Sequence, residues 1–302
     1  MAVCPAWLHD PSMGEPVPVA PLPPVLVRGT FDWWGSDAAA RPHPVPAPPP
    51  PGVFAQQRGR YADAYARNRW RFRVRYDCRQ RRYSLRTIAE RLGMPLRGRT
   101  ILDVGFGSGD LLFLADPSCR VCGVELSRSA IDRARATAAR RGYRDFDFRE
   151  AREDGRLDYP DGFFDLAICS HVLEHVPNDL ATLAEIRRVL RPRGLAFLFV
   201  PVEPEGFDPK HERQYGVRSL VKRVEAAGLR AHYVEGQMRW AWPVKFLEVP
   251  DLHGGGAWAQ ACDALRHVLA LPLPMRAGEA FDRLLARVGV PETQALVVAA
   301  PA

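Results

Sequence analysis

The stretch ILDVGFGSGDLL, residues 101–112, places three glycines within five positions directly after a short apolar run. Glycine permits positive φ and lets backbone N–H groups approach a ligand closely. Twenty residues after Gly105, Glu125 closes the next apolar run, CGVEL. A carboxylate at that position can accept hydrogen bonds from both hydroxyls of a ribose. Together the two features predict a glycine turn between a strand and a helix, with a ribose-binding acid at the end of the following strand.

Short apolar runs alternate with helical segments from residue 99 onward. The predicted strands are 99–106, 119–126, 144–150, 164–170, 195–202, 229–237 and 293–300. The predicted helices are 109–115, 128–142, 179–194 and 217–228, with Ser127 and Asn178 as N-caps of the second and third. This alternation indicates an α/β fold, in which helices cover both faces of a parallel sheet. No helix follows the last strand, so we expect it antiparallel at the sheet edge.

Two segments precede this core, which we assign to residues 99–237 and 291–302. Residues 1–52 hold half of the 28 prolines. Proline fixes φ and removes a backbone donor, so this segment is expected to be an irregular or extended arm. Residues 53–98 form an arginine-rich extension, which we predict to be mostly helical. Its alternation of arginine with aromatic residues would suit RNA, but arginine stems that cover apolar surface are the more ordinary explanation.

An apolar insertion, residues 238–290, separates the last two predicted strands. A simple hairpin would need two to five residues, so this segment must have a structure of its own. It either covers a substrate as a lid or packs on the body of the protein. In the first case Trp240, Trp242 and Trp258 would line an apolar pocket.

Composition limits the class of protein further. The chain has 302 residues, 47% of them apolar, and a formal net charge of +7. It contains no apolar run long enough to span a membrane and no secretory signal at its start, and its six cysteines form no framework. We therefore expect a cytoplasmic protein. The oligomeric state stays open, with a homodimer as one option.

Beyond the glycine turn, the chain resembles the class I S-adenosylmethionine-dependent methyltransferases, especially the small-molecule group with a type 11 or 12 methyltransferase domain. The matching pieces are LDVGFGSG, VELS, YPDGFFDLAICSHVLEHV, LRPRGLAFLFVP and KHERQYGVRSLVKRVEAAGL. They span roughly residues 85–237. The resemblance implies S-adenosylmethionine as cofactor. It also implies a Rossmann-like, doubly wound and mostly parallel seven-stranded sheet with an antiparallel last strand.

The resemblance also implies roles for single residues. Asp103, Gly105, Phe106, Gly107 and Gly109 would line the methionine and ribose side of the cofactor. Glu125 would bind the ribose diol and Leu126 would lie against the adenine. Glu150 and Ala151 would read the adenine amine, or Glu153 and Asp154 with a shifted loop. Ser170 and His171 would flank the methionine.

The segment SHVLEHV, residues 170–176, carries the candidate chemistry. A helical turn would bring His171, Glu174 and His175 to one face, at the same sheet edge as His211. Three interpretations stay open: an ordinary turn, a general base formed by His171, His175 or His211, or a metal site. Small-RNA 2′-O-methyltransferases and ubiquinone-pathway O-methyltransferases carry a similar E-x-x-E-H with a divalent ion. Of the two chemical roles, histidine is the better acid–base candidate by default, so no metal is assigned.

These features predict methyl transfer to oxygen or carbon of a small molecule, in the setting of secondary metabolism. The Asn/Asp-Pro-Pro-Tyr/Phe motif typical of amine methylation is missing after the fourth strand, where SHVL stands. One alternative is an RNA methyltransferase that grips phosphates with residues 58–91. Another is a scaffold that keeps the fold without transferring methyl, although the intact glycine turn and Glu125 argue against it.

Overall fold

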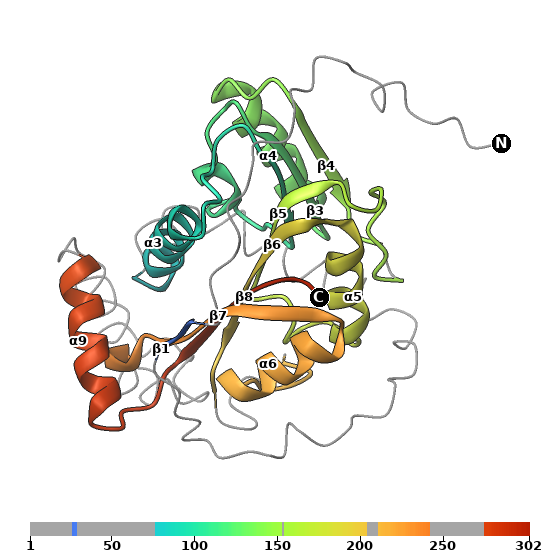
Figure 1. Ribbon diagram of the computed structural model, residues 1–302. Coiled ribbons are helices and arrows are strands. Elements are labelled where there is room, and N and C mark those ends of the chain that lie inside the picture. Colours follow the sequence, from blue (N-terminus) through green and yellow to red (C-terminus); the bar gives the residue numbers. More distant parts are fainter. Residues whose placement is uncertain (1–25, 29–75, 153, 204–210, 242–274) are drawn as a thin grey trace, which may run out of the picture.

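A single sheet forms the centre of the computed structural model, which describes residues 26–28, 76–152, 154–203, 211–241 and 275–302 (Figure 1). The sheet has eight strands in the order β1-β7-β8-β6-β5-β2-β3-β4. Their bounds are β1 Leu26–Arg28, β2 Thr100–Val104, β3 Arg120–Glu125, β4 Phe146–Glu150, β5 Phe164–Ser170, β6 Leu190–Pro201, β7 Leu229–Gln237 and β8 Gln294–Pro301. Strand β8 is antiparallel to its two neighbours, and every other pair is parallel. The predicted α/β class with an antiparallel last strand is confirmed.

Two details of the sheet differ from the prediction. Strand β8 lies between β6 and β7 rather than at the edge. Residues 295–300 are buried throughout, and such a run of apolar residues gains most when strands flank it on both sides. Strand β1 is an eighth strand, contributed by the proline-rich arm, and it pairs in parallel with β7 at the sheet edge. A segment of a proline-rich arm can pair at the edge of a sheet, because an edge strand forms ladder hydrogen bonds on one side only. Its other side needs no backbone N–H donors.

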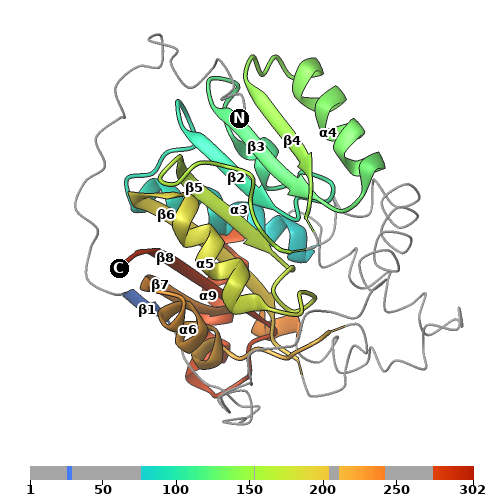
Figure 2. The ribbon, with the colours of Figure 1, turned by 90° about the vertical axis from the view of Figure 1, so that its right-hand side faces the viewer.

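Helices cover both faces of the sheet. Helices α3 (Tyr76–Arg91) and α4 (Arg128–Arg140) pack on one face, and α5 (Asp179–Val189) and α6 (Val217–Ala226) pack on the other. Figure 1 shows α3 to the left of the sheet and α5 and α6 to its right; in Figure 2, α5 and α6 face the viewer. The sheet thus separates two apolar clusters, one on each side.

Two predicted helices are shorter than expected. After the glycine turn only a 3-10 turn forms, η3 (Leu112–Leu114), because Pro117 follows closely and β3 begins at Arg120. The helix predicted over 179–194 ends at Val189, where β6 takes over. Pro192 disfavours helical backbone at the residue before it, so the chain extends here instead. The predicted caps are present: Ser127 accepts from Ala130 N and Asn178 from Ala181 N.

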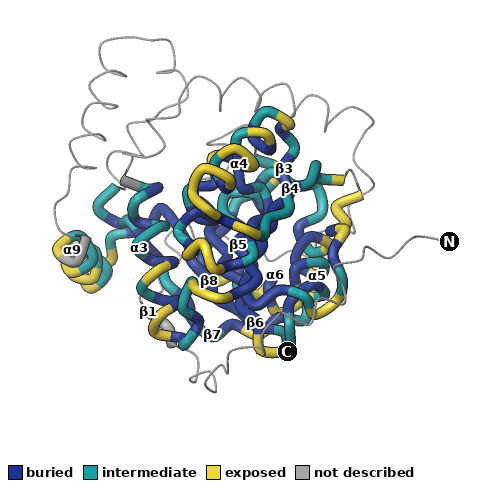
Figure 3. Tube along the Cα trace, turned by 90° about the horizontal axis from the view of Figure 1, so that it is seen from above, coloured by how far each residue is buried: buried dark blue, intermediate teal, exposed yellow. Residues whose placement is uncertain are grey.

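The insertion is described only at its ends, as η4 (Arg239–Ala241) and α9 (Met275–Arg287). Helix α9 stands at the outer side of the molecule and contacts η4 (Figure 3). Trp242, Trp258 and the arginine-rich stretch before Tyr76 lie outside the described residues. Among the described helices, none combines the length and apolar content needed to cross a bilayer.

The N-terminus of α5 is held by a buried ion cluster. Asp179 is fully buried and accepts from Arg223 Nε at 2.7 Å and from the Tyr215 hydroxyl at 2.6 Å. Burial alone would raise the pKa of Asp179, but the hydrogen bonds from Arg223 and Tyr215 outweigh it and lower the pKa. The cluster thus links the N-terminus of α5 to α6. Both helices lie on the face of the sheet that also carries the turn before α5.

Replacing Asp179 with alanine should cost about 3–5 kcal/mol in the free energy of unfolding, because Arg223 then lies half-buried without its carboxylate. The measurement is chemical denaturation at pH 7. Since the pKa of Asp179 is lowered, its contribution is present above about pH 4 and is lost as the pH falls through the folded-state value. The difference between wild type and Asp179→Asn should therefore shrink in acid.

The control is Asp132→Asn, an exposed partner of Arg135 on α4, which should change stability by less than about 0.5 kcal/mol. Equal losses for the Asp179 and Asp132 variants would show that the buried cluster does not hold α5.

Candidate active site

The glycine turn lies where β2 meets its two neighbours, β3 on one side and β5 on the other. In a doubly wound sheet this reversal of strand order is the point at which ligands bind. Gly105, Gly107 and Gly109 all have positive φ, at 70°, 50° and 74°. A Cβ on Gly105 would stand 2.4 Å from Val172 Cγ2. The turn therefore packs directly against the segment that carries His171.

Glu125 reaches from the end of β3 into this turn. Its carboxylate is 5% exposed, and it accepts from Gly107 N at 2.9 Å and from Ser127 N at 3.0 Å. Burial raises the pKa of Glu125, and the backbone N–H groups oppose that shift. Each oxygen accepts one backbone bond, and a carboxylate oxygen has two lone pairs. One lone pair on each oxygen remains for a ribose hydroxyl, so the residues present fit the nucleoside end of the expected cofactor.

The remaining residues that were predicted to bind the cofactor surround the turn, and they differ in how accessible they are to a ligand. Burial, and next the charge of Glu125, raise the pKa of Asp103 well above its ordinary value. The Phe106 ring packs inward on Phe148, with centroids 5.4 Å apart, so Phe106 can offer a cofactor only its backbone. Leu126 is half-buried at the rim. Glu150 pairs in register with Glu125 and accepts from Arg128 Nε at 3.1 Å.

Two predicted residues close the rim on either side. Ala151 donates its backbone N–H to Glu125 O at 3.0 Å, and Ser170 ends β5 in a half-buried position. Glu153, one of the alternatives for the adenine amine, lies outside the described residues, and Asp154 pairs with the exposed Arg152.

The histidine segment is not a helical turn, contrary to the prediction. His171 has a φ of 56°, and a single tight turn follows in which His175 N donates to Val172 O at 2.9 Å. Left-handed backbone breaks a helix after one residue, and histidine is among the residues that tolerate it. The grouping of the side chains nevertheless holds, because the turn brings a ring nitrogen of His171 and one of His175 within 4.0 Å of Glu174 Oε1.

Glu174 lies at the centre of this group. It is 1% exposed, and neither carboxylate oxygen accepts a hydrogen bond within the described structure. Its Oε1 is 3.7 Å from His171 Nδ1 and 4.0 Å from His175 Nε2. Burial raises the pKa of Glu174 to about 7. Near neutral pH the carboxyl group of Glu174 can therefore be protonated, or be ionised beside a protonated histidine, at a similar cost in free energy.

His211 completes the cluster from the loop before α6. Its ring lies 4.8 Å from that of His175, and its Nδ1 is 2.9 Å from Glu203 Oε2. Ligand atoms of Glu174, His175 and His211 all lie within 4.8 Å of one another. The geometry therefore suits a histidine base oriented by carboxylates, and a divalent transition metal could also be held by two imidazoles and a carboxylate. The predicted fourth ligand, His171, is not part of this group of three, although its Nδ1 lies 3.7 Å from Glu174 Oε1.

Sequence reasoning missed three residues here: Glu203, Gln237 and Gln294. Gln294 is the first residue of β8, and its Oε1 is 3.4 Å from His171 Nε2. Gln237 is paired with Gln294 across the two strands, and no feature of the sequence around it indicated a functional role. The only sequence feature that pointed to Gln294 was its polar amide directly before the apolar run ALVVAA.

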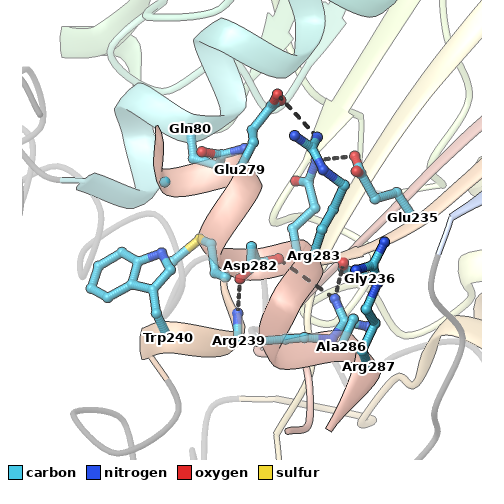
Figure 4. A pocket seen from close by; sticks show the side chains of 13 residues that line it. Gln80, Glu235, Gly236, Arg239, Trp240, Glu279, Asp282, Arg283, Ala286 and Arg287 are labelled. Atoms are coloured by element: carbon cyan, nitrogen blue, oxygen red, sulfur yellow. Dashed lines mark hydrogen bonds and ion pairs between the residues drawn. The ribbon is translucent and has the colours of Figure 1, made fainter. Parts of the chain in front are cut away.

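A cavity of about 370 Å³ lies between α3, β7, η4 and α9 (Figure 4). Trp240 lines it, as the lid interpretation expects, but charged groups such as Glu279, Asp282 and Arg283 form much of the remaining described wall. Gln237 belongs both to this wall and to the contacts beside His171. Two buried side chains, Gln237 and Gln294, thus connect the cavity wall to His171.

Replacing Glu125 with glutamine should weaken binding of S-adenosylhomocysteine, the product form of the expected cofactor, by about 10- to 100-fold. The reason is the loss of charged acceptors for the ribose hydroxyls, each worth about 1.5–3 kcal/mol. Isothermal titration calorimetry measures the change. Asp161→Asn, an exposed partner of Arg188 at the opposite edge, is the matched control and should bind as the wild type does. Equal affinities for all three proteins would remove Glu125 from the binding site.

Comparison with known proteins agrees with this geometry. A methyltransferase-domain family model matches residues 102–198. A ubiquinone biosynthesis O-methyltransferase from Paracidovorax citrulli is 33% identical over 107 residues, 34% of this chain and 44% of that protein. A 27-O-demethylrifamycin SV methyltransferase from Amycolatopsis mediterranei is 34% identical over 143 residues, 44% of this chain and 50% of that protein. The chain thus matches half or less of the length of these relatives.

Among solved structures, the crystal structure of the [4+2]-cyclase SpnF is similar over 72% of this chain and 79% of that one. The identity is 26% and the TM-score is 0.50. The region that the family model matches, residues 102–198, contains the glycine turn, Glu125 and the histidine segment. Residues 102–198 thus form a methyltransferase domain of the class I, S-adenosylmethionine-dependent type.

Proposed function

We propose that this protein transfers a methyl group from S-adenosylmethionine to an oxygen, or to a carbon, of a small-molecule acceptor. The observation that supports the proposal is the close packing of Gly105 on Val172, which brings the glycine turn against the histidine segment. The donor site and a cluster of candidate bases therefore share one edge of the sheet. The names of the ubiquinone and rifamycin relatives support oxygen as the acceptor atom and, for rifamycin, a setting in secondary metabolism.

When bound, S-adenosylmethionine supplies a methyl group on a sulfonium, which needs no further activation. The protein's share is alignment and removal of a proton. Glu125 would hold the ribose, and Ser170 and His171 would flank the methionine. His171 or His175 would take the proton from the acceptor hydroxyl. Glu174, 3.7 Å from His171 Nδ1, would stabilise the imidazolium that results.

His211 would orient this group. Its Nδ1 lies 2.9 Å from Glu203 Oε2, and ligand atoms of His211, His175 and Glu174 lie within 4.8 Å of one another, so Glu203 would fix the orientation of the ring beside them. The same three residues are the alternative metal site, and removal of divalent cations separates the two interpretations.

The RNA alternative receives little support from the described part of the chain. Of the arginine-rich segment, only α3 is described, and there Arg81 forms an ion pair with Asp77 at 3.5 Å. The alternating arginine and aromatic residues lie outside the described residues. A cytoplasmic location, a homodimer and the lid role of the insertion stay predictions.

His171→Ala and His175→Ala should bind S-adenosylhomocysteine like the wild type, while at least one of them lowers kcat by about 100-fold or more, since a positioned base contributes about 10²–10⁴. The assay is release of S-adenosylhomocysteine with a panel of hydroxylated aromatic acceptors. The wild type should keep its activity after treatment with EDTA.

Near-wild-type turnover in both variants would exclude the base. Loss of activity with EDTA, restored by a divalent cation, would favour the metal site. Cofactor binding without transfer to any acceptor would contradict methyl transfer, and steeply salt-dependent RNA binding would favour the RNA alternative.

A further inference from the structure

A line of buried polar side chains runs from His171 to the cavity beside α9. His171 Nε2 is 3.4 Å from Gln294 Oε1, and Gln294 Nε2 donates to Gln237 Oε1 at 2.8 Å. Gln237 Nε2 donates to Glu235 Oε2 at 2.7 Å and to Ser84 Oγ at 2.9 Å. Gln237 and Gln294 are each 2% exposed. Its hydrogen bonds join residues that lie up to 153 positions apart in the chain.

The strands explain why these side chains meet. Gln237 and Gln294 are directly opposite each other in the antiparallel pair β7–β8, where side chains on one face come into contact. Glu235 is two residues before Gln237 on β7 and so points to the same face. That face is covered by α3, which supplies Ser84. Glu235 also lines the cavity (Figure 4), so one end of the line meets that space. The other end meets His171.

The direction of every hydrogen bond in this line follows from one group. An ionised carboxylate can only accept, so Glu235 requires the NH₂ group of Gln237. The oxygen of Gln237 then faces Gln294 and requires the NH₂ group of that amide. The oxygen of Gln294 is left toward His171, and a carbonyl oxygen can only accept. A neutral His171 that donates to this oxygen carries its proton on Nε2, whereas Glu174 Oε1, at 3.7 Å from Nδ1, is too distant to accept a hydrogen bond from Nδ1.

We propose that Glu235, Gln237 and Gln294 are positioning residues that hold neutral His171 in the Nε2–H form and leave Nδ1 as its basic nitrogen. The proposal deepens the proposed function and rests on it for its catalytic meaning. In the transfer, the acceptor O–H bond breaks as its proton forms a bond to Nδ1. The oxygen bonds to the methyl carbon, whose bond to sulfur breaks with its electron pair left on sulfur. The new imidazolium faces Glu174 Oε1 from Nδ1.

The test is nitrogen NMR of the full-length protein with ¹⁵N-labelled histidine, at about pH 8.5, above the ordinary histidine range. His171→Ala identifies the His171 signals. The wild type should show a protonated Nε2 and an unprotonated Nδ1. Gln294→Met and Gln237→Met should each introduce the second tautomer and lower kcat by about tenfold, the effect of one net hydrogen bond, with unchanged affinity for S-adenosylhomocysteine.

Three further variants separate positioning from simple packing. Gln294→Glu keeps an acceptor for Nε2–H and should retain the single tautomer. Glu235→Gln, at the half-buried cavity wall, lets the amide of Gln237 turn over and should introduce the second tautomer even if the methionine variants fail to fold. Thr293→Val removes a neighbouring hydrogen bond, from Thr293 Oγ1 to Met238 O at 3.0 Å, and should leave the His171 signals unchanged.

A proton on Nδ1 in the wild type would overturn the proposal. So would a single Nε2–H form that persists in Gln294→Met, Gln237→Met and Glu235→Gln. The NMR readout does not depend on turnover. Full activity of His171→Ala with the expected tautomer pattern would remove the base role and leave the hydrogen-bond line intact.

Discussion

The close packing of Gly105 against Val172 is the contact on which the rest of the site depends. Any side chain at residue 105 would overlap the valine, and its φ of 70° disfavours any residue other than glycine. Because of this contact, the loop after β2 and the loop after β5 share one surface. A nucleoside held by Glu125, as we propose, would then lie beside the histidine cluster. The chemistry follows from the approach of two backbones rather than from any single charged residue.

Around this contact the protein buries many polar groups and compensates most of them. Glu125 receives two backbone N–H groups, and Asp179 receives Arg223 and Tyr215. Glu174 differs, because its buried carboxylate lies near two histidines without a hydrogen bond from the described residues. An uncompensated buried carboxylate is costly and is kept where a proton or a cation must be exchanged. This contrast distinguishes Glu174 from Glu125 and Asp179, and it supports the proposal that the histidine cluster is the reactive part of the molecule.

Local signals predicted much of this arrangement, and long-range contacts account for most of what was missed. The glycine turn, Glu125 and the caps Ser127 and Asn178 follow from short spacings, so they were predicted correctly. The position of β8 between β6 and β7 and the pairing of β1 could not be predicted, because strand order depends on contacts across most of the chain. The same holds for Gln237 and Gln294, which lie 57 residues apart and meet only through the sheet. The segment at 171–175 was wrongly predicted as helical, because a spacing of three and four fits a tight turn as well as a helix.

The most direct test of this account is a crystal structure of the protein with bound S-adenosylhomocysteine. The account predicts the ribose hydroxyls on the carboxylate of Glu125 and the sulfur beside Ser170 and His171, with the glycine turn in the conformation described. A ligand bound elsewhere, or a turn whose space is filled by the protein's own side chains, would contradict it.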